Sequence, residues 1–525
     1  MVFAYYRPGK LTVACFLFSM MIFFACTNFK KNASHQQIPD VNLVHGKKLA
    51  ETYCQSCHML PDPLLLDAKT WENGVLPSMG PHLGIFYYGF KEYPSGRRDV
   101  NIDKNFYPAK PIINFIDWQY IIDYYTTVSP DSLPAQQRTK PVQENNALFK
   151  SETPLPENKI PTVCFVKIDT SKNPHQLILS DVGNSNIYRL DSHLLTLDSF
   201  KSHSPVVDLE IHNQEMITCN IGNINPNDAK YGSLSHLSIA TNGQLQADSN
   251  FQINKLARPV QVSSADFNQD GKTDYLVCEF GNLTGALSWI ENLGNNKYEK
   301  HTLRALPGAI KAYIRDVNND GLPDIWALFS QGEEGIFLFT NKGKGKFVQE
   351  EILRFPSVFG STYFEMADFN KDGYPDIVYT CGDNADFSPI LKPYHGVYIF
   401  INDHNNHFKQ QYFFPMHGCF KAMARDFDGD GDLDIAAISF FADYEHHPEE
   451  SFVYLQNNGE WDFQPYTIPG MSKGRWLTMD AGDLDGDGKT DLVIGNFSVA
   501  PHSEKITIDW KQGPPFIMLK NIMKK

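Results

Sequence analysis

Apolar and polar positions follow one order again and again after residue 160. A short apolar segment leads to a nine-residue polar loop, and a second apolar segment, such as "YLVCEF", follows the loop. A third segment ends near an asparagine and a fourth is rich in aromatic residues, as in "ALSWIENLGNNKYEK". The repeats lie 50 to 58 residues apart. Four short strands at this regular spacing predict the radial blades of an all-β propeller.

The polar loops share acidic positions that point to a metal. They read "DFNQDGKTD", "DVNNDGLPD", "DFNKDGYPD", "DFDGDGDLD" and "DLDGDGKTD". Oxygen side chains at positions 1, 3, 5 and 9, a glycine at 6 and the carbonyl of residue 7 can converge on one Ca²⁺, which needs six to eight hard oxygens at about 2.4 Å. The alternative is an Asp/Gly-rich turn without metal.

These loops resemble the FG-GAP or VCBS repeats of integrin α-subunit propellers, which implies up to five calcium ions. The candidate ligands are Asp266, Asn268, Asp270, Lys272, Asp274, Asp316, Asn318, Asp320, Leu322, Asp324, Asp368, Asn370, Asp372, Tyr374, Asp376, Asp426, Asp428, Asp430, Asp432, Asp434, Asp483, Asp485, Asp487, Lys489 and Asp491.

Two earlier stretches keep the strand pattern but lack the acids. They run over residues 164–190 and 206–223 and predict two further blades without calcium. We therefore expect a seven-bladed propeller over residues 159–525. The last blade lacks an outer strand after "FIMLKNI", and "NALFKSE" at 146–152, in a polar linker over 131–158, can supply it and close the ring.

The segment "VHGKKLAETYCQSCH" carries reactive side chains at the front of the chain. Cys54, Cys57 and His58 form Cys-x-x-Cys-His, the attachment pattern for c-type haem, after a stretch with helical spacing. A second apolar helix is predicted over "NFIDWQYIIDYYTTVSP". Residues 41–130 resemble an all-α class I cytochrome c domain. The resemblance implies one haem c bound covalently by Cys54 and Cys57, with His58 as proximal iron ligand. A redox CxxC or half a zinc site is the alternative.

The second axial ligand is a choice between two residues. Met79 lies in "VLPSMGPHLG", an irregular loop like those that present the distal methionine in the resembling family. Its spacing from His58 is short for that family, so His82 is the alternative, and Met79 can instead be a core residue. We predict Met79.

The N-terminus has the pattern of an export signal. Arg7 and Lys10 precede an apolar run from Leu11 to Ala25, which is too short to span a membrane as a helix. The run ends at Cys26 in a sequence that resembles the bacterial lipobox, which implies lipid attachment at Cys26. We expect a signal peptide over 1–25 and a tether over 26–40, with the protein in the bacterial envelope, periplasm-facing or at the outer-membrane surface. An uncleaved anchor or ordinary signal peptide is the alternative.

The formal net charge of −15 excludes nucleic acid as an expected partner. Against this background, Arg258, Lys311, Lys421 and Arg475 recur near the start of the innermost strands, which predicts an anion-binding mouth of the channel; solvated strand ends are the alternative.

Three functions are consistent with this sequence. The first is a lipid-anchored electron-transfer protein whose propeller docks a redox partner protein or a membrane electron carrier. The second is a haem-linked dehydrogenase that holds pyrroloquinoline quinone in the channel. The third is a carbohydrate- or polymer-binding surface protein, which leaves the haem motif unexplained.

Overall fold

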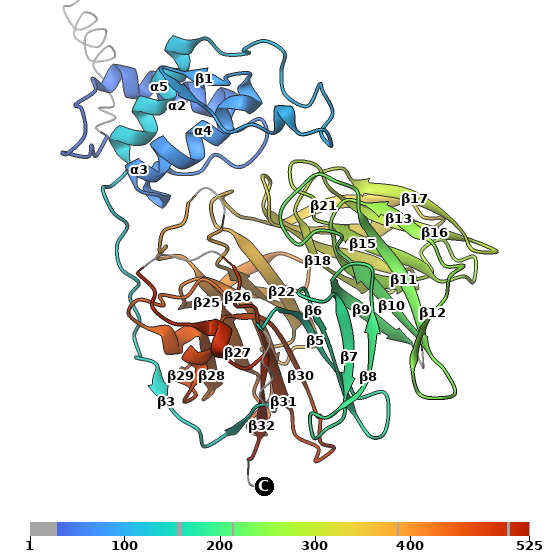
Figure 1. Ribbon diagram of the computed structural model, residues 1–525. Coiled ribbons are helices and arrows are strands. Elements are labelled where there is room, and N and C mark those ends of the chain that lie inside the picture. The colour runs from blue at the N-terminus through green and yellow to red at the C-terminus, as the bar shows by residue number, and fades with distance from the viewer. Residues whose placement is uncertain (1–28, 155–159, 213–214, 386–387, 501–504, 524–525) are drawn as a thin grey trace, which may run out of the picture.

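The computed structural model describes residues 29–154, 160–212, 215–385, 388–500 and 505–523. A helical unit, residues 29–130, lies above a ring of seven β-sheets (Figure 1). The predicted seven-bladed propeller is confirmed. The predicted signal peptide and lipid attachment at Cys26 lie outside the described residues. No described helix is long and apolar enough to cross a membrane.

Each blade is built on antiparallel strands that follow chain order outward from the innermost strand, apart from two added strands in blades 6 and 7. The second strands of blades 3 to 7 are buried along their whole length, in agreement with their unbroken apolar sequences. The strands of blades 1 to 4 are β5 (Val163–Asp169), β6 (Gln176–Asp181), β7 (Asn186–Leu190), β8 (Thr196–Lys201); β9 (Val206–His212), β10 (Glu215–Asn220), β11 (Gly232–Ile239), β12 (Leu245–Ala247), with β13 (Ile253–Leu256) beside β11; β14 (Pro259–Ala265), β15 (Asp274–Glu279), β16 (Ala286–Gly294), β17 (Lys297–Arg304); and β18 (Ala309–Arg315), β19 (Asp324–Phe329), β20 (Gly335–Asn341), β21 (Phe347–Arg354).

Segments from before the propeller complete its last two blades. The antiparallel strands of blades 5 to 7 are β22 (Ser361–Ala367), β23 (Asp376–Cys381), β24 (Gly396–Asn402), β25 (Phe408–Pro415); β26 (Cys419–Arg425), β27 (Asp434–Ser439), β28 (Phe452–Asn457), β29 (Phe463–Thr467); and β30 (Trp476–Gly482), β31 (Asp491–Asn496), β32 (Phe516–Asn521). Strand β4 (Phe149–Glu152) pairs with β32 as the fourth strand of blade 7. Strand β3 (Gln143–Glu144) adds a parallel fifth strand to blade 6. Blade 7 thereby takes its outer strand from the segment just before blade 1, which joins the two ends of the ring.

The helical unit is built on two crossing helices, α2 (Asp40–Tyr53) and α5 (Phe115–Val128). They approach so closely that a Cβ at Gly46 would lie 2.0 Å from the Tyr120 carbonyl oxygen, so only glycine fits there. Between them lie the helical turns α3 (Ala68–Thr70) and α4 (Leu76–Met79). A hairpin of β1 (Tyr87–Tyr88) and β2 (Lys91–Glu92) also occurs, although the sequence predicts helices only. Gly89, with φ of +58°, permits its tight turn.

The helical unit is seated on loops of blades 4 and 5. The Tyr394 hydroxyl donates to the carbonyls of Leu65 (3.1 Å) and Val358 (3.3 Å). Val358 and Ile390 pack against the apolar core of the helical unit. The helical unit and the propeller are therefore joined by side-chain contacts as well as by the linker.

Candidate functional sites

Cys54, Cys57 and His58 lie at the end of α2, in the turns that follow the helix. The Cys54 amide still donates to the Ala50 carbonyl (2.8 Å), and the Cys57 amide donates to that of Cys54 (3.3 Å). Both thiols are free, Cys54 half-buried and Cys57 exposed. Burial, together with the nearby Cys57, raises the pKa of the Cys54 thiol to about 11. The pair is therefore available for covalent attachment and is not used in a disulfide.

The orientation of His58 leaves one ring nitrogen for a metal. Its Nδ1 lies 2.9 Å from the Met59 carbonyl oxygen and 3.5 Å from the Ser357 hydroxyl of the propeller. Because a carbonyl can only accept, Nδ1 carries the proton, and the lone pair of a neutral ring is then on Nε2. A histidine held in this way is typical of metal ligands, whose second nitrogen donates to a backbone carbonyl.

The segment after the motif is held by α5 and by Trp71. The Tyr125 hydroxyl donates to the Pro61 carbonyl (3.1 Å), and the Trp71 indole donates to that of Pro63 (2.9 Å). Ser129 also donates to the Pro63 carbonyl (2.7 Å). These buried bonds fix where the chain leaves His58. The residues present therefore fit a covalently attached haem: two thiols, one histidine with a free lone pair, and a rigid apolar wall.

The two candidates for the opposite axial position lie in different surroundings. Met79 ends α4 and is half-buried against the apolar core of the helical unit. His82 is exposed on one side, and its ring contacts those of Phe106 and Tyr107 on the other. Partial burial among these groups lowers the pKa of His82, and the charge of His58 lowers it further. Met79 and His82 both remain candidates for this position.

The five acidic loops share a hydrogen-bond arrangement that the sequence does not reveal. The position-9 aspartate is fully buried in every loop. In blade 4, the two carboxylate oxygens of Asp324 accept from the amides of Val317 (3.0 Å) and Asn341 (2.7 Å). The same pair of bonds recurs at Asp274, Asp376, Asp434 and Asp491. Position 9 therefore ties the loop to the third strand, in addition to any role as a ligand.

Two loops bring three carboxylates together. Oxygens of Asp426, Asp428 and Asp434 lie within 4.8 Å of one another, as do those of Asp483, Asp485 and Asp491. Burial raises the pKa of Asp434 to about 7 and that of Asp491 to about 6, and neighbouring aspartates act in the same direction. A divalent cation would relieve this repulsion, so these donor sets fit calcium. In the first and fifth loops the position-5 acid is paired with the position-7 lysine, Asp270 with Lys272 and Asp487 with Lys489.

A third group of possible ligands lies outside the loops. Oxygens of Glu291 and Glu299 lie within 4.8 Å of a His301 nitrogen, and the ring of His301 bonds to Glu291 (2.8 Å). Glu291 in turn accepts from the Asn268 amide (2.9 Å) of the first calcium loop. The group is therefore held by its own hydrogen bonds beside that loop.

The four basic residues expected at the channel mouth fall into two arrangements. Lys311 and Lys421 both lie over the Tyr363 ring, and the Lys421 ammonium donates to the Met479 carbonyl (2.6 Å). Arg258 donates to the carbonyls of Ile224 and Gly281, in loops of blades 2 and 3. Arg475, buried in blade 7, donates to the carbonyls of Phe440 and Ala500.

Acidic side chains accompany the two lysines. Burial lowers the pKa of Lys421 to about 8, whereas Asp480, Glu365 and Asp208 raise it. Asp208 and Asp480 also accept from backbone amides of the next blade, those of Val262 and Ile168. The lysines are thus offset by acids that join neighbouring blades.

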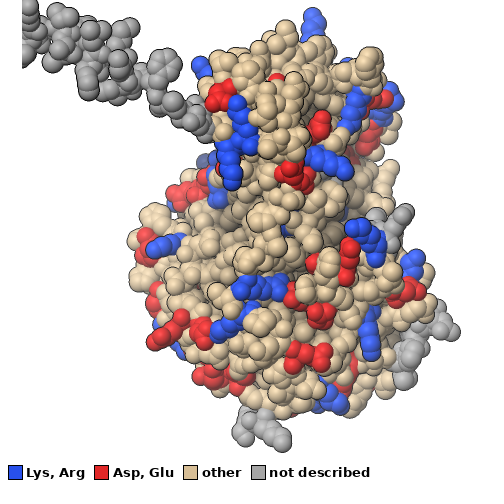
Figure 2. Space-filling model, turned by 90° about the vertical axis from the view of Figure 1, so that its left-hand side faces the viewer, with Lys and Arg blue, Asp and Glu red and all other residues tan. Residues whose placement is uncertain are grey.

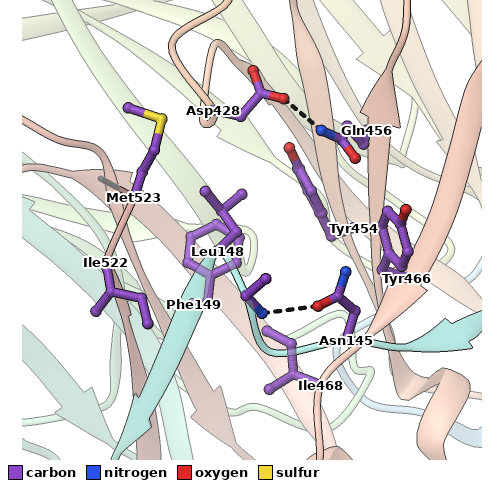
Figure 3. A pocket seen from close by; sticks show the side chains of 11 residues that line it. Asn145, Leu148, Phe149, Asp428, Tyr454, Gln456, Tyr466, Ile468, Ile522 and Met523 are labelled. Carbon is purple, nitrogen blue, oxygen red and sulfur yellow. Dashed lines mark hydrogen bonds between the residues drawn. The ribbon is translucent and has the colours of Figure 1, made fainter. Parts of the chain in front are cut away.

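A cavity of about 400 Å³ opens at the seam of blades 6 and 7 (Figure 3). Leu148 and Phe149 of the closing segment, Tyr466 and Ile522 form its apolar wall. Asp428, a candidate calcium ligand, lines the opposite side and accepts from Gln456 (2.7 Å). The cavity therefore adjoins the fourth calcium loop, far from Cys54 and Cys57.

A match to a protein family supports the repeat assignment. The FG-GAP-like repeat family matches residues 266–327, 316–379 and 426–494. No curated protein matches the chain. Among solved structures, virginiamycin B lyase from Staphylococcus aureus is 12% identical, with a TM-score of 0.43 over 71% of this chain and 99% of that chain.

Two further solved structures are similarly distant. The N-terminal domain of Nup159 is 10% identical, with a TM-score of 0.41 over 73% and 98% of the two chains. BBS1N, solved in complex with ARL6DN, is 8% identical, with a TM-score of 0.42 over 72% and 97%. Such distant likenesses say nothing of what this chain binds. The propeller is thus one with FG-GAP-like repeats.

Proposed function

We propose that the protein is an exported, lipid-anchored electron-transfer protein whose helical unit carries one haem c and whose propeller is a calcium-stabilised docking platform. The observation that carries the proposal is the placement of Cys54, Cys57 and His58 together at the end of α2, with the Nδ1 of His58 bonded and its Nε2 left for iron. Haem c, when bound, supplies one-electron transfer. The protein's own residues attach it, orient His58 and exclude water with the apolar core around Trp71 and Trp118.

The propeller loops support the docking part of the proposal. Ser357 and Tyr394 place blades 4 and 5 directly beside the motif, so a partner held next to these loops would lie close to the residues that would hold the haem. The five FG-GAP-like loops would hold calcium through oxygens at positions 1, 3, 5, 7 and 9 and stabilise the strand hairpins, and two of the loops bring three carboxylates within 4.8 Å of one another. A redox protein or a membrane electron carrier is the expected partner.

Covalent haem is tested by denaturing the purified protein after expression with c-type maturation. We expect a c-type pyridine haemochrome, and haem that stays with the chain on a denaturing gel. Cys54→Ser with Cys57→Ser should release it, whereas Cys278→Ser, a buried blade thiol, should not. Complete extraction of haem from the unaltered protein by acidified organic solvent would exclude covalent attachment.

The axial ligand is tested on the same material. Met79→Ala should remove a weak near-infrared band if sulfur ligates the iron. If the band is absent or unchanged and His82→Ala alters the visible spectrum, His82 is the ligand.

A further inference from the structure

Large apolar side chains are exposed on the helical unit. Phe90, at the turn of the β1–β2 hairpin, is fully exposed, and Ile116 at the start of α5 is 71% exposed. Val41 in α2 is 73% exposed, and Phe115 is 54% exposed. Isolated apolar residues are normal on a protein surface, but a group of them marks an interaction site.

Contacts between the elements bring these residues to one face. The His45 ring of α2 lies against the Tyr120 ring of α5 (4.9 Å) and 3.5 Å from the Asp117 carboxylate. Val41 lies one turn before His45 in α2, and Ile116 directly precedes Asp117 in α5. Tyr88 of the hairpin contacts the Phe115 ring (6.3 Å), which extends the same face to Phe90. We call Val41, Phe90, Phe115 and Ile116 the apolar face.

The apolar face is turned away from the propeller. Figure 1 shows α2, α5 and β1 on the upper side of the helical unit and α3 on the side nearer the blades. The propeller contacts come from Leu65 and Ser357 with His58, which lie on that other side. The propeller therefore leaves the apolar face uncovered.

The helical unit and the rest of the chain differ in net charge. Residues 29–130 hold ten Lys and Arg against ten Asp and Glu, whereas residues 131–525 hold 34 against 51. Both signs are mixed on the face of the helical unit in Figure 2. An anionic bilayer would repel the propeller and leave the neutral helical unit without repulsion, so the helical unit would face the lipid.

The predicted anchor leads to the same unit. Phe29, the first described residue, packs against Tyr124 of α5, and the Asn32 amide donates to the Thr127 carbonyl (2.8 Å). The chain preceding Phe29 carries the apolar run and Cys26. A tether that ends here holds the helical unit, rather than the propeller, within a few residues of the bilayer.

We propose that the apolar face docks on the lipid surface, with Phe90 and Ile116 inserted at the headgroup level and the propeller held away from the membrane. This inference rests on the proposed tether and adds an orientation to it. A lipid anchor at Cys26 leaves the orientation of the helical unit free, and a second apolar contact with the bilayer removes that freedom.

The test places a tryptophan at the apolar face of the full-length, haem-loaded protein. Phe90→Trp is reconstituted with vesicles of phosphatidylcholine and phosphatidylglycerol that carry brominated acyl chains. The matched control is Leu195→Trp, at an exposed leucine (57%) in the β7–β8 turn of blade 1. We expect the emission of the tryptophan introduced at position 90 to be quenched roughly twofold more than that of the tryptophan introduced at position 195. Adding Val41→Ser and Ile116→Ser to Phe90→Trp should abolish the difference.

Several outcomes would overturn the inference. Equal quenching at positions 90 and 195, or failure of every variant to bind vesicles at high lipid concentration, would exclude docking. A change of oligomeric state on Ile116→Ser without quenching would assign the face to self-association instead. Mass spectrometry of Cys26 and the haemochrome spectrum report separately on the tether and the haem, so their failure is distinguishable.

Discussion

Asp324→Ala should destabilise the propeller even when calcium is removed. Both oxygens of the buried Asp324 carboxylate accept backbone amides, those of Val317 and Asn341. Hydrogen bonds to a charged acceptor contribute about 1.5–3 kcal/mol each, and the alanine variant leaves two amides without an acceptor. We therefore expect a loss of about 3–5 kcal/mol in the free energy of unfolding.

The assay is denaturant unfolding in chelator and again in excess calcium. Asp320→Ala, at the exposed position 5 of the same loop, is the control, because the bonds it loses, from the Leu322 amide and the Asn318 side chain, are open to water. In chelator, Asp320→Ala should lose less than about 1 kcal/mol. Asp324→Asn keeps the shape but turns an amide donor toward one of the two N–H groups, so it should also destabilise.

Equal losses for Asp324→Ala and Asp320→Ala in chelator would refute this reasoning. So would a loss for Asp324→Ala that is seen only with calcium, because position 9 would then act as a ligand alone. Comparing the two variants with and without calcium separates the role of position 9 as an acceptor for backbone amides from its role as a calcium ligand.

Three other perturbations test the structure. Chelation should lower the melting temperature, because emptying each site removes RT ln(1 + [Ca]/Kd) from the free energy of unfolding, about 2.7 kcal/mol at 100 Kd. Asp426→Ala should reproduce part of this loss, and calorimetry that is indifferent to chelator would contradict calcium binding. Burial raises the pKa of Glu334 to about 7, above its ordinary value. The folded protein therefore binds more protons than the unfolded chain, and its stability falls as pH rises from about 5 to 7. Across that range the stability of Glu334→Gln should rise by up to about 3 kcal/mol relative to that of the unaltered protein, and a stability difference that does not change with pH would exclude this. Tyr394→Phe removes the hydroxyl bond to Leu65 and should weaken the contact between the helical unit and the propeller by about 1–2 kcal/mol. Hydrogen exchange at residues 61–66 measures this loss, and unchanged exchange would show that the bond does not hold the helical unit.

The propeller is predictable from sequence because each repeat contains its own strands and turns. The unbroken apolar runs are the fully buried second strands, and the Asp-rich loops mark the hairpins. The double role of Asp324 is not predictable, because a metal ligand and an acceptor for backbone amides need the same side chain. The asparagines that end the third strands are visible in the sequence, yet their pairing with position 9 depends on the register of β19 and β20.

Contacts between distant segments give no periodic signal. The bond from Tyr394 to Leu65 joins residues 329 positions apart, and neither side chain stands out in its own sequence. The recurrence of Arg258, Lys311, Lys421 and Arg475 says nothing of their hydrogen-bond partners. Loop carbonyls, which every residue possesses, accept from the two arginines.

The helical unit is held by attachments of different physical kinds, and this has a consequence for electron transfer. Tyr394 lies on a stack of rings, 4.6 Å from Phe359 and at 16° to it, and Phe355 lies on Tyr379 at 4.0 Å and 11°. Flat, stacked rings have few alternative packings, so the seat sets an orientation as well as a position. The linker adds hydrogen bonds along the blades, where Gln136 donates to the His395 carbonyl (2.8 Å). A unit fixed in this way keeps a constant distance between Cys54 and the loops of blades 4 and 5, whereas a flexible linker would average over many distances. In the proposed function, a redox partner that binds beside those loops would then lie at one separation from the proposed haem site.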